Sequence, residues 1–327
     1  MMSGSATAPT RSPKLPTMTF YDLAAPAKLN LFLHVTGRRH DGYHLLQSLF
    51  RLVSLSDSVT VDLRRDGLIS REGSLNQVVA VESDLTVRAA KALQKATGVS
   101  LGVNIHVQKR IPFGAGLGGG SSDAATVLLA LNRLWRTGLS RQQLMQIGLS
   151  LGADVPFFLH GDAGFVQGVG EQIETVCAPD QSYLVFKPSV SIATAEVFSD
   201  PDLTRDTENV KITDFSGCIN FIGCETAGVS GFGSNDLEVV VLKKFSAVRQ
   251  VKYWLASQGL QTRLTGSGSC LFAEAGSPER AQLALEKLIV KMQSDKEMPD
   301  QMLGASLESV HVCDGLSQHP LKYWVSN

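Results

Sequence analysis

From Ile111 to Asp123 the chain reads Ile-Pro-Phe-Gly-Ala-Gly-Leu-Gly-Gly-Gly-Ser-Ser-Asp, and five of the seven positions from 114 to 120 are glycine. Glycine has no Cβ and reaches positive φ at little cost, so successive N–H groups of such a loop can converge on one anion. A helical pattern follows directly, and the N-terminus of a helix adds further N–H groups and the positive end of its dipole. The stretch therefore predicts a phosphate-binding loop, and we expect the chain to bind a nucleotide or a phosphate ester.

The P-loop and the dinucleotide-binding loop are two known glycine-rich motifs, and this sequence lacks a residue that each of them requires. Gly114 and Gly119 have the P-loop spacing, but glycine stands at position 120 where that motif needs lysine. Gly114, Gly116 and Gly119 also fit the dinucleotide-binding pattern, which requires an acidic residue about 20 positions later. No acidic residue occurs from 124 to 153. A Rossmann-type oxidoreductase is therefore the less favoured alternative, and the helix in register disfavours a flexible loop without a ligand.

The helix after the loop is recognisable from its period. Apolar residues recur at helical spacing from 124 to 135, so one face is expected to pack on a core. Ser121 or Ser122 is expected to cap the N-terminus. Asp123 would stand in the first turn, where a carboxylate stabilises an empty helix but lies near a bound phosphate. Both roles of Asp123 stay open.

Composition and charge are those of an ordinary enzyme. The 327 residues, 43% of them hydrophobic, favour two domains, and the net charge of −1 gives no electrostatic case for nucleic acid or an anionic membrane as a partner. No run approaches the roughly 18 apolar residues of a transmembrane helix. The five cysteines contain no C-x-x-C pair, so we expect reduced thiols in the cytoplasm, with neither a disulfide framework nor a zinc site.

The N-terminal segment differs from the rest. Residues 1–19 are rich in Ser, Thr, Pro and Ala and contain no acidic residue. They lack the apolar core of a secretory signal, and their prolines oppose the amphipathic helix of a transit peptide. We expect a disordered leader, a tag remnant or a natural start at Met18.

The remaining chain alternates strand and helix patterns without internal repeats. The expected strands are 29–35, 58–63, 101–108, 183–187, 261–264, 270–275 and 309–313. The expected helices, besides the one after the loop, are 84–97, 142–151, 237–257 and 278–293. The glycine-rich segment 161–171 is expected to turn back across the site. A boundary near 172–182 would divide an N-terminal domain, 20–175, from a C-terminal domain, 176–327.

A lysine and an asparagine alternate with apolar residues in Pro26-Ala27-Lys28-Leu29-Asn30. On a strand, Lys28 and Asn30 project to the same face. An ammonium beside an amide suits a ligand rich in oxygen. The ordinary alternative, a strand with one solvated face, is favoured on this segment alone.

Two further segments contain candidate side chains. In the segment 38–44, Gly42 argues against the helix that a His40–His44 metal pair would need. A turn that presents Tyr43 and His44 to a base is the better interpretation, and a hairpin tip without a ligand is the alternative. Asp154 stands among small and apolar residues, which suits a general base, although a carboxylate at a helix end is the ordinary explanation.

Together these segments resemble the GHMP kinase superfamily. Its three ordered motifs correspond here to 26–30, 112–125 and 264–269, and the resemblance extends over roughly residues 22 to 315. The segments 38–44, 152–157, 168–171 and 194–198 are most similar to the members that phosphorylate a cytidine-diphosphate-linked methylerythritol at its 2-hydroxyl, in non-mevalonate isoprenoid synthesis.

The resemblance implies a role for each motif. Lys28 and Asp154 would be catalytic, with Asp154 taking the proton of the hydroxyl. ATP, bridged by Mg²⁺, would contact Pro112, Gly114, Gly116, Leu117, Gly118, Gly119, Gly120, Ser121 and Ser122. The small-molecule substrate would contact Asn30, Tyr43, His44, Phe198, Gly266, Ser267 and Gly268. No side chain is assigned to the metal, and we expect a monomer or weak homodimer in the cytoplasm.

The resemblance also implies an α+β fold of two domains with the site in the cleft between them. The N-terminal ATP-binding domain would contain a left-handed βαβ unit, and the C-terminal domain would be ferredoxin-like. A catalytically silent nucleotide-binding protein on the same fold is a further alternative. The presence of both Lys28 and Asp154 favours the enzyme.

Overall fold

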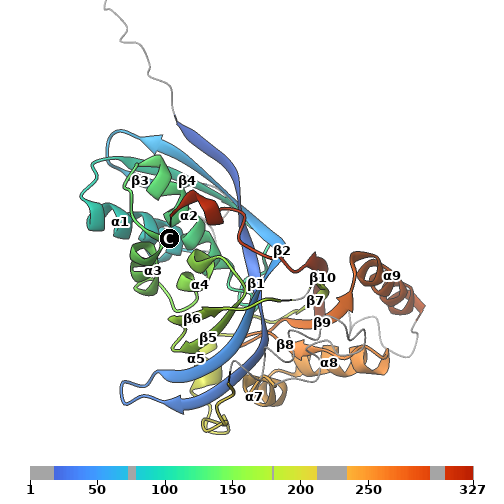
Figure 1. Ribbon diagram of the computed structural model, residues 1–327. Helices are drawn as coiled ribbons and strands as arrows, with labels where there is room; N and C mark the ends of the chain where they lie inside the picture. The colour runs from blue at the N-terminus through green and yellow to red at the C-terminus, as the bar shows by residue number, and fades with distance from the viewer. Residues whose placement is uncertain (1–17, 73–78, 179, 212–233, 295–305, 327) are drawn as a thin grey trace, which may run out of the picture.

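The computed structural model describes residues 18–72, 79–178, 180–211, 234–294 and 306–326. Within them the chain forms two α+β domains, and two long strands run along their junction (Figure 1). Residues 1–17 of the expected leader lie outside the described part, whereas the first strand already begins at Thr19.

The N-terminal sheet is organised around β2 (His44–Arg64). β2 pairs antiparallel with β1 along most of its length, with β5 through its first half and with β4 through its second half. The strand order is β3-β4-β2-β5-β6, with β1 also on β2. The other strands are β1 (Thr19–Arg38), β3 (Ile69–Glu72), β4 (Gly102–Gln108), β5 (Gly164–Gly168) and β6 (Gln172–Thr175). β1 and β2 are much longer than expected because bulges let them bend across both domains without losing their pairing.

Four helices of the described part belong to this domain, and α2 lies at its centre. They are α1 (Leu85–Thr97), α2 (Gly119–Leu134), α3 (Arg141–Leu149) and α4 (Val155–His160), with a short 3-10 turn at Val81–Ser83. Nearly every residue of α2 from 122 to 134 is buried. The prediction that one face of α2 packs on a core was therefore incomplete. The sheet, α1 and α4 together enclose the helix.

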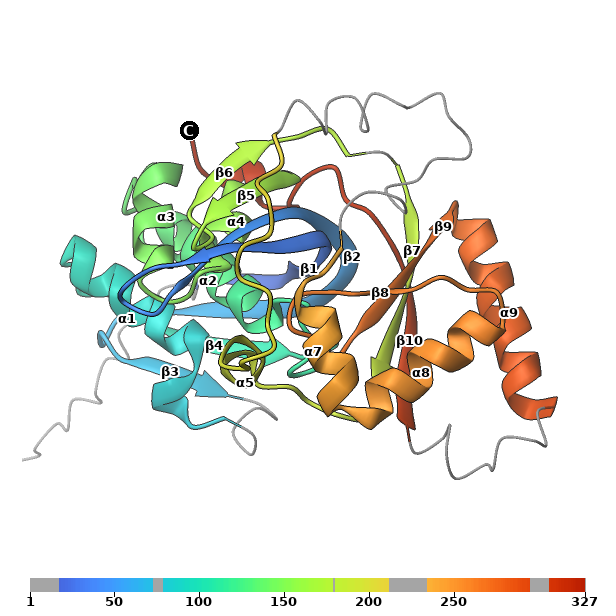
Figure 2. The ribbon, with the colours of Figure 1, turned by 90° about the horizontal axis from the view of Figure 1, so that it is seen from below.

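The C-terminal domain is ferredoxin-like, as expected. Its antiparallel sheet has the order β10-β7-β9-β8, and the chain runs strand, helices, two strands, helix, strand. The strands are β7 (Ser182–Pro188), β8 (Arg263–Leu264), β9 (Leu271–Gly276) and β10 (Leu307–Asp314). The helices are α5 (Thr194–Phe198), α7 (Leu237–Lys244), α8 (Ser246–Ser257) and α9 (Pro278–Ser294). Figure 2 shows α7, α8 and α9 beside this sheet.

The prediction of one helix over 237–257 was wrong. Phe245 is in an extended conformation between α7 and α8, and its side chain packs against the hydrophobic core of the C-terminal domain. The periodicity gave no signal of this break, where the partly buried Phe245 ring contacts residues that are distant in the sequence.

The last residues return to the N-terminal domain. Leu321 joins its core, the Trp324 and Phe20 rings are 5.0 Å apart, and Arg141 donates a hydrogen bond to the Lys322 carbonyl at 2.6 Å. A short 3-10 turn lies at Lys322–Trp324, and Figure 1 shows the C-terminus over the first domain. No helix of the described part is long and apolar enough to span a bilayer.

Candidate active site

The free edge of β1 is the support of the site. Among the described strands β1 pairs with β2 alone, so N–H groups on its other edge need partners outside the sheet. The Lys28 N–H donates to the Leu117 carbonyl of the glycine-rich loop at 3.0 Å, and the Asn30 N–H donates to Thr265 Oγ1 at 2.9 Å. One strand thereby brings together two loops that lie far apart in sequence.

The glycine-rich loop has the backbone that its composition predicted. Gly114, Gly116 and Gly118 have φ of 57°, 75° and 72°. A Cβ on Gly116 would lie 2.1 Å from the Thr265 carbonyl oxygen, and one on Gly118 would lie 2.9 Å from the Phe158 ring. Both positions therefore exclude a side chain, by conformation and by space.

The expected serine cap of α2 was wrong. Gly118 is the N-cap, and the helix begins at Gly119, so Ser121 and Ser122 lie inside its first turn. The left-handed Gly118 and its close packing decide this start, which places Ser121 at the cavity and buries Ser122 in the helix.

The loop after β8, residues 265–269, packs directly on the glycine-rich loop. The Ser269 and Cys270 N–H groups donate to the Gly114 and Ala115 carbonyls at 3.3 and 3.2 Å. Buried Asn235 holds the β8 side of this contact, because its Nδ2 donates to the Leu264 carbonyl at 2.9 Å and to the Gly266 carbonyl at 2.8 Å. Asn235 was not identified from the sequence, where no local pattern distinguishes it.

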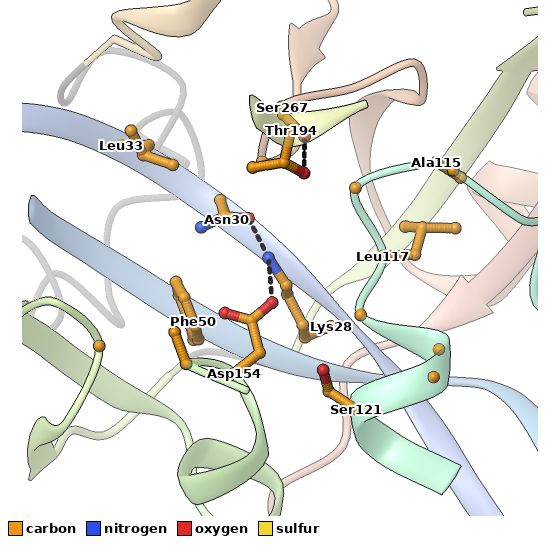
Figure 3. Close-up of a pocket in the computed structure, with 18 of the residues that line it drawn as sticks. Lys28, Asn30, Leu33, Phe50, Ala115, Leu117, Ser121, Asp154, Thr194 and Ser267 are labelled. Atoms are coloured by element: carbon orange, nitrogen blue, oxygen red, sulfur yellow. Dashed lines mark hydrogen bonds and ion pairs between the residues drawn. The ribbon is translucent and has the colours of Figure 1, made fainter. Parts of the chain in front are cut away.

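Lys28, Asn30 and Asp154 converge on one point of the cavity (Figure 3). Lys28 Nζ lies 3.7 Å from Asp154 Oδ2 and donates to Asn30 Oδ1 at 2.5 Å. Lys28 is 3% and Asn30 1% exposed, so the solvated strand face favoured on this segment alone was wrong: the two loops cover it. Burial lowers the pKa of the Lys28 ammonium, and the Asp154 carboxylate acts in the opposite direction.

Asp154 occupies the N-cap position of α4 but does not cap the helix. Its side chain makes no capping hydrogen bond, although aspartate at this position usually accepts one from the first turn. Instead the carboxylate faces Lys28 at the cavity and is 34% exposed. The ordinary explanation of a helix-terminal carboxylate therefore does not account for this side chain.

The cavity has a volume of about 440 Å³. The expected site residues that line it are Lys28, Asn30, Pro112, Gly114, Gly116, Leu117, Gly118, Gly119, Gly120, Ser121, Asp154, Phe198, Gly266 and Ser267. Val169 and Gly170 also line it, so the segment 161–171 turns back to the site as expected. Ser122, Tyr43, His44 and Gly268 lie outside the lining.

Tyr43 and His44 lie where β2 begins. Tyr43 is 65% exposed on the turn between β1 and β2. The His44 ring lies 5.0 Å from the Phe198 ring, with 34° between the ring planes. The tertiary structure thus brings the end of α5 to the start of β2.

A buried charge cluster below the glycine-rich loop was missed by the sequence interpretation. Lys109 forms ion pairs with Asp57 and, at 2.7 Å, with Asp123. Asp57 also accepts hydrogen bonds from the Arg110 and Ile111 N–H groups at 2.6 and 2.8 Å. Burial raises the pKa of Asp123 to about 7; Lys109 opposes this rise and Asp57 adds to it. The cluster joins the start of α2 to β2. The sequence had indicated Asp123 in the first turn of the helix, but neither Lys109 nor Asp57.

Asp123→Asn should flatten the dependence of stability on pH. The pKa of Asp123 is about 7 in the folded chain against an ordinary 3.8, so the folded state binds more protons between these values. The free energy of unfolding therefore falls as pH rises through this interval. Thermal melting from about pH 5 to about pH 8 should show a smaller decrease for the variant than for the unsubstituted chain. Parallel melting profiles would contradict the assignment.

Three ordered motifs around one cavity, on this pair of domains, define a GHMP kinase, a class of small-molecule phosphotransferases. Comparisons agree with the class. The model of the GHMP kinases N-terminal domain matches residues 84–162, and the model of the GHMP kinases C-terminal domain matches residues 226–292.

Similar proteins and solved structures identify the family within this class. A Bordetella parapertussis protein called 4-diphosphocytidyl-2-C-methyl-D-erythritol kinase is 50% identical over 95% of this chain and 100% of its own length, and a Thiobacillus denitrificans protein of that name is 48% identical over 91% and 96%. The chain belongs to the 4-diphosphocytidyl-2-C-methyl-D-erythritol kinase family. A crystal structure of 4-(cytidine 5'-diphospho)-2C-methyl-D-erythritol kinase matches with a TM-score of 0.70 and 31% identity, over 91% of this chain and 99% of that one. Homoserine kinase from Cytophaga hutchinsonii, at 15% identity and a TM-score of 0.66 over 96% and 98%, shares the fold.

Proposed function

We propose that this chain transfers the γ-phosphoryl group of ATP to the 2-hydroxyl of 4-diphosphocytidyl-2-C-methyl-D-erythritol, a step of non-mevalonate isoprenoid precursor synthesis. The proposal rests mainly on one observation. Buried Lys28 is paired with Asp154, whose side chain makes no capping hydrogen bond, in a cavity lined by the glycine-rich loop. The names of the relatives support the choice of substrate.

Each side chain has a task that its position suits. The N–H groups of the loop and of the first turn of α2 bind the phosphates of ATP. Asp154 accepts the proton of the attacking hydroxyl, and Lys28 stabilises the negative charge that develops on the transferred group. Asn30 orients the acceptor. Phosphoryl transfer depends mainly on such positioning and electrostatics, which act strongly at a buried lysine.

Mg²⁺ is part of the proposal as the partner of ATP. The described residues include no group of three or more His, Cys, Asp or Glu side chains that could hold a metal ion. Mg²⁺ often binds through one or two carboxylates together with substrate phosphates and water. The Ser121 hydroxyl faces the cavity and would be an oxygen ligand of the ion beside the phosphates and water. When bound, the ion would neutralise charge on the phosphates.

Phe198→Ala should weaken binding of the cytidine substrate much more than binding of ATP. We propose that Phe198 and Tyr43 stack on the two faces of the cytosine, and the loss of one aromatic contact typically costs about 1–3 kcal/mol per base. Calorimetric titration of both ligands into the variant measures the two losses. Tyr253→Ala, which removes an exposed ring of α8, is the surface control. An equal loss for both ligands, or none for the substrate, would remove Phe198 from the base site.

A coupled assay tests the function as a whole. ADP release should require both ATP and the cytidylylated methylerythritol. Mevalonate should not replace the cytidylylated methylerythritol as the acceptor. A chain that binds both ligands but releases no ADP would be a silent nucleotide-binding protein. A thermal shift with NAD(P) and none with ATP would favour the oxidoreductase alternative.

We further expect the protein to be cytoplasmic and to form a monomer or a weak homodimer. Sedimentation can distinguish the monomer from the homodimer.

A further inference from the structure

Arg205 is held in place beside His44 by four hydrogen bonds. Its Nε donates to His44 Nε2 at 3.1 Å. Its Nη1 donates to the Leu203 carbonyl at 2.9 Å, and its Nη2 donates to the Phe198 and Asp200 carbonyls at 3.1 and 2.6 Å. The three carbonyls fix the guanidinium, so the contact with His44 follows from the fold of the segment after α5.

The contact determines which nitrogen of His44 carries the proton. A guanidinium has N–H donors and no acceptor, so Nε2 must be the acceptor. In a neutral imidazole the hydrogen then sits on Nδ1. Burial lowers the pKa of His44, and the positive charges of Arg205 and Arg38 lower it further, which favours the neutral ring. Nδ1 has no hydrogen-bond partner within the part of the chain that the structure describes.

We propose that Arg205 is a positioning residue that keeps His44 in the Nδ1–H tautomer and thereby makes the base site selective for cytosine. The identity of the base rests on the proposed function. The His44 ring lies 5.0 Å from the Phe198 ring, so its N–H can meet the edge of a base that stacks on Phe198. N3 of cytosine accepts a hydrogen bond, whereas N3 of uracil carries a hydrogen. A fixed donor therefore pairs with cytosine and opposes uracil.

The tautomer is measured directly by long-range ¹H–¹⁵N correlation spectra of the labelled protein, with the His44 signals assigned by their loss in His44→Asn. We expect hydrogen on Nδ1 in the unsubstituted chain and a mixture of tautomers in Arg205→Met, with Arg205→Lys restoring the Nδ1–H form because its ammonium again donates. Arg249→Met is the matched control, since Arg249 also binds two carbonyls, at 2.8 and 3.3 Å, without touching a histidine. Hydrogen on Nε2 in the unsubstituted chain, or an unchanged spectrum in Arg205→Met, would overturn the proposal.

Kinetics test the consequence for selectivity. Arg205→Met should raise KM for the cytidine substrate by about tenfold and lower the preference over the uridine analogue by a similar factor, with the effect in KM rather than kcat. Equal losses with both substrates and a lowered melting temperature would indicate a purely structural role and contradict the proposal. If the unsubstituted chain phosphorylates neither substrate, the proposed function fails, and the tautomer spectra still decide the role of Arg205.

Discussion

Asp154→Asn should lower the rate of phosphoryl transfer by about 10²–10⁴ while ATP binds almost as before. The amide keeps the size and the hydrogen-bonding reach of the carboxylate but cannot accept the proton of the hydroxyl. Because the side chain makes no helix-capping hydrogen bond, its replacement should leave α4 intact. Single-turnover transfer at saturating ATP isolates the chemical step, and a titration of ATP measures binding in the same variant.

Asp162→Asn is the matched control for this experiment. Asp162 lies just after α4 and pairs with Lys322 at 2.6 Å, away from the residues that line the cavity. Its substitution should therefore spare turnover. Near-normal transfer in Asp154→Asn would mean that the proton passes to solvent or to the phosphate, and Asp154 would be left as a positioning residue.

Lys28→Met should lower the transfer rate by about 10²–10³, the usual loss when one preorganised group that stabilises transition-state charge is removed. Methionine fills the space of the aliphatic stem beside Phe50, over whose ring Lys28 Nζ lies at 4.6 Å, so the change tests charge more than packing. Lys322→Met removes the ammonium of the control pair and should leave the rate unchanged. Full transfer by Lys28→Met would exclude a role for this ammonium in the chemistry.

The two catalytic substitutions should not add. In the proposed mechanism Lys28 and Asp154 act on one developing charge and one proton, and groups that act as a unit give a double variant close to the worse single variant. The four-member cycle is measured by the same single-turnover assay. Fully additive losses would show that the two groups work independently, and the 3.7 Å contact would then be incidental to catalysis.

Several features of the site could be predicted because they are local. The glycine-rich loop needs only one contiguous stretch, since its positive-φ positions require glycine whatever surrounds them. The common face of Lys28 and Asn30 follows from the period of a strand, and their hydrogen bond confirms it. The ferredoxin-like domain followed from the resemblance, which the order of its strands confirms.

The predictions that were wrong concern features that depend on contacts between distant segments of the chain. Local propensity could not foresee that an extended Phe245 separates two helices, or that Gly118 rather than a serine starts α2. Burial of Lys28 and Asn30 was misjudged because the covering loops come from elsewhere in the chain.

The sequence by itself determined the glycine-rich loop and the class of the protein, and it singled out Lys28 and Asp154 as the candidate pair, because each rests on short motifs whose backbone or chemistry is local. Only the tertiary structure decided the partners of those motifs. Lys109 meets Asp57 across 52 positions, and Arg205 meets His44 across 161. Such pairs depend on strand register and domain packing, and no period or spacing along the chain encodes which distant donor will meet which acceptor.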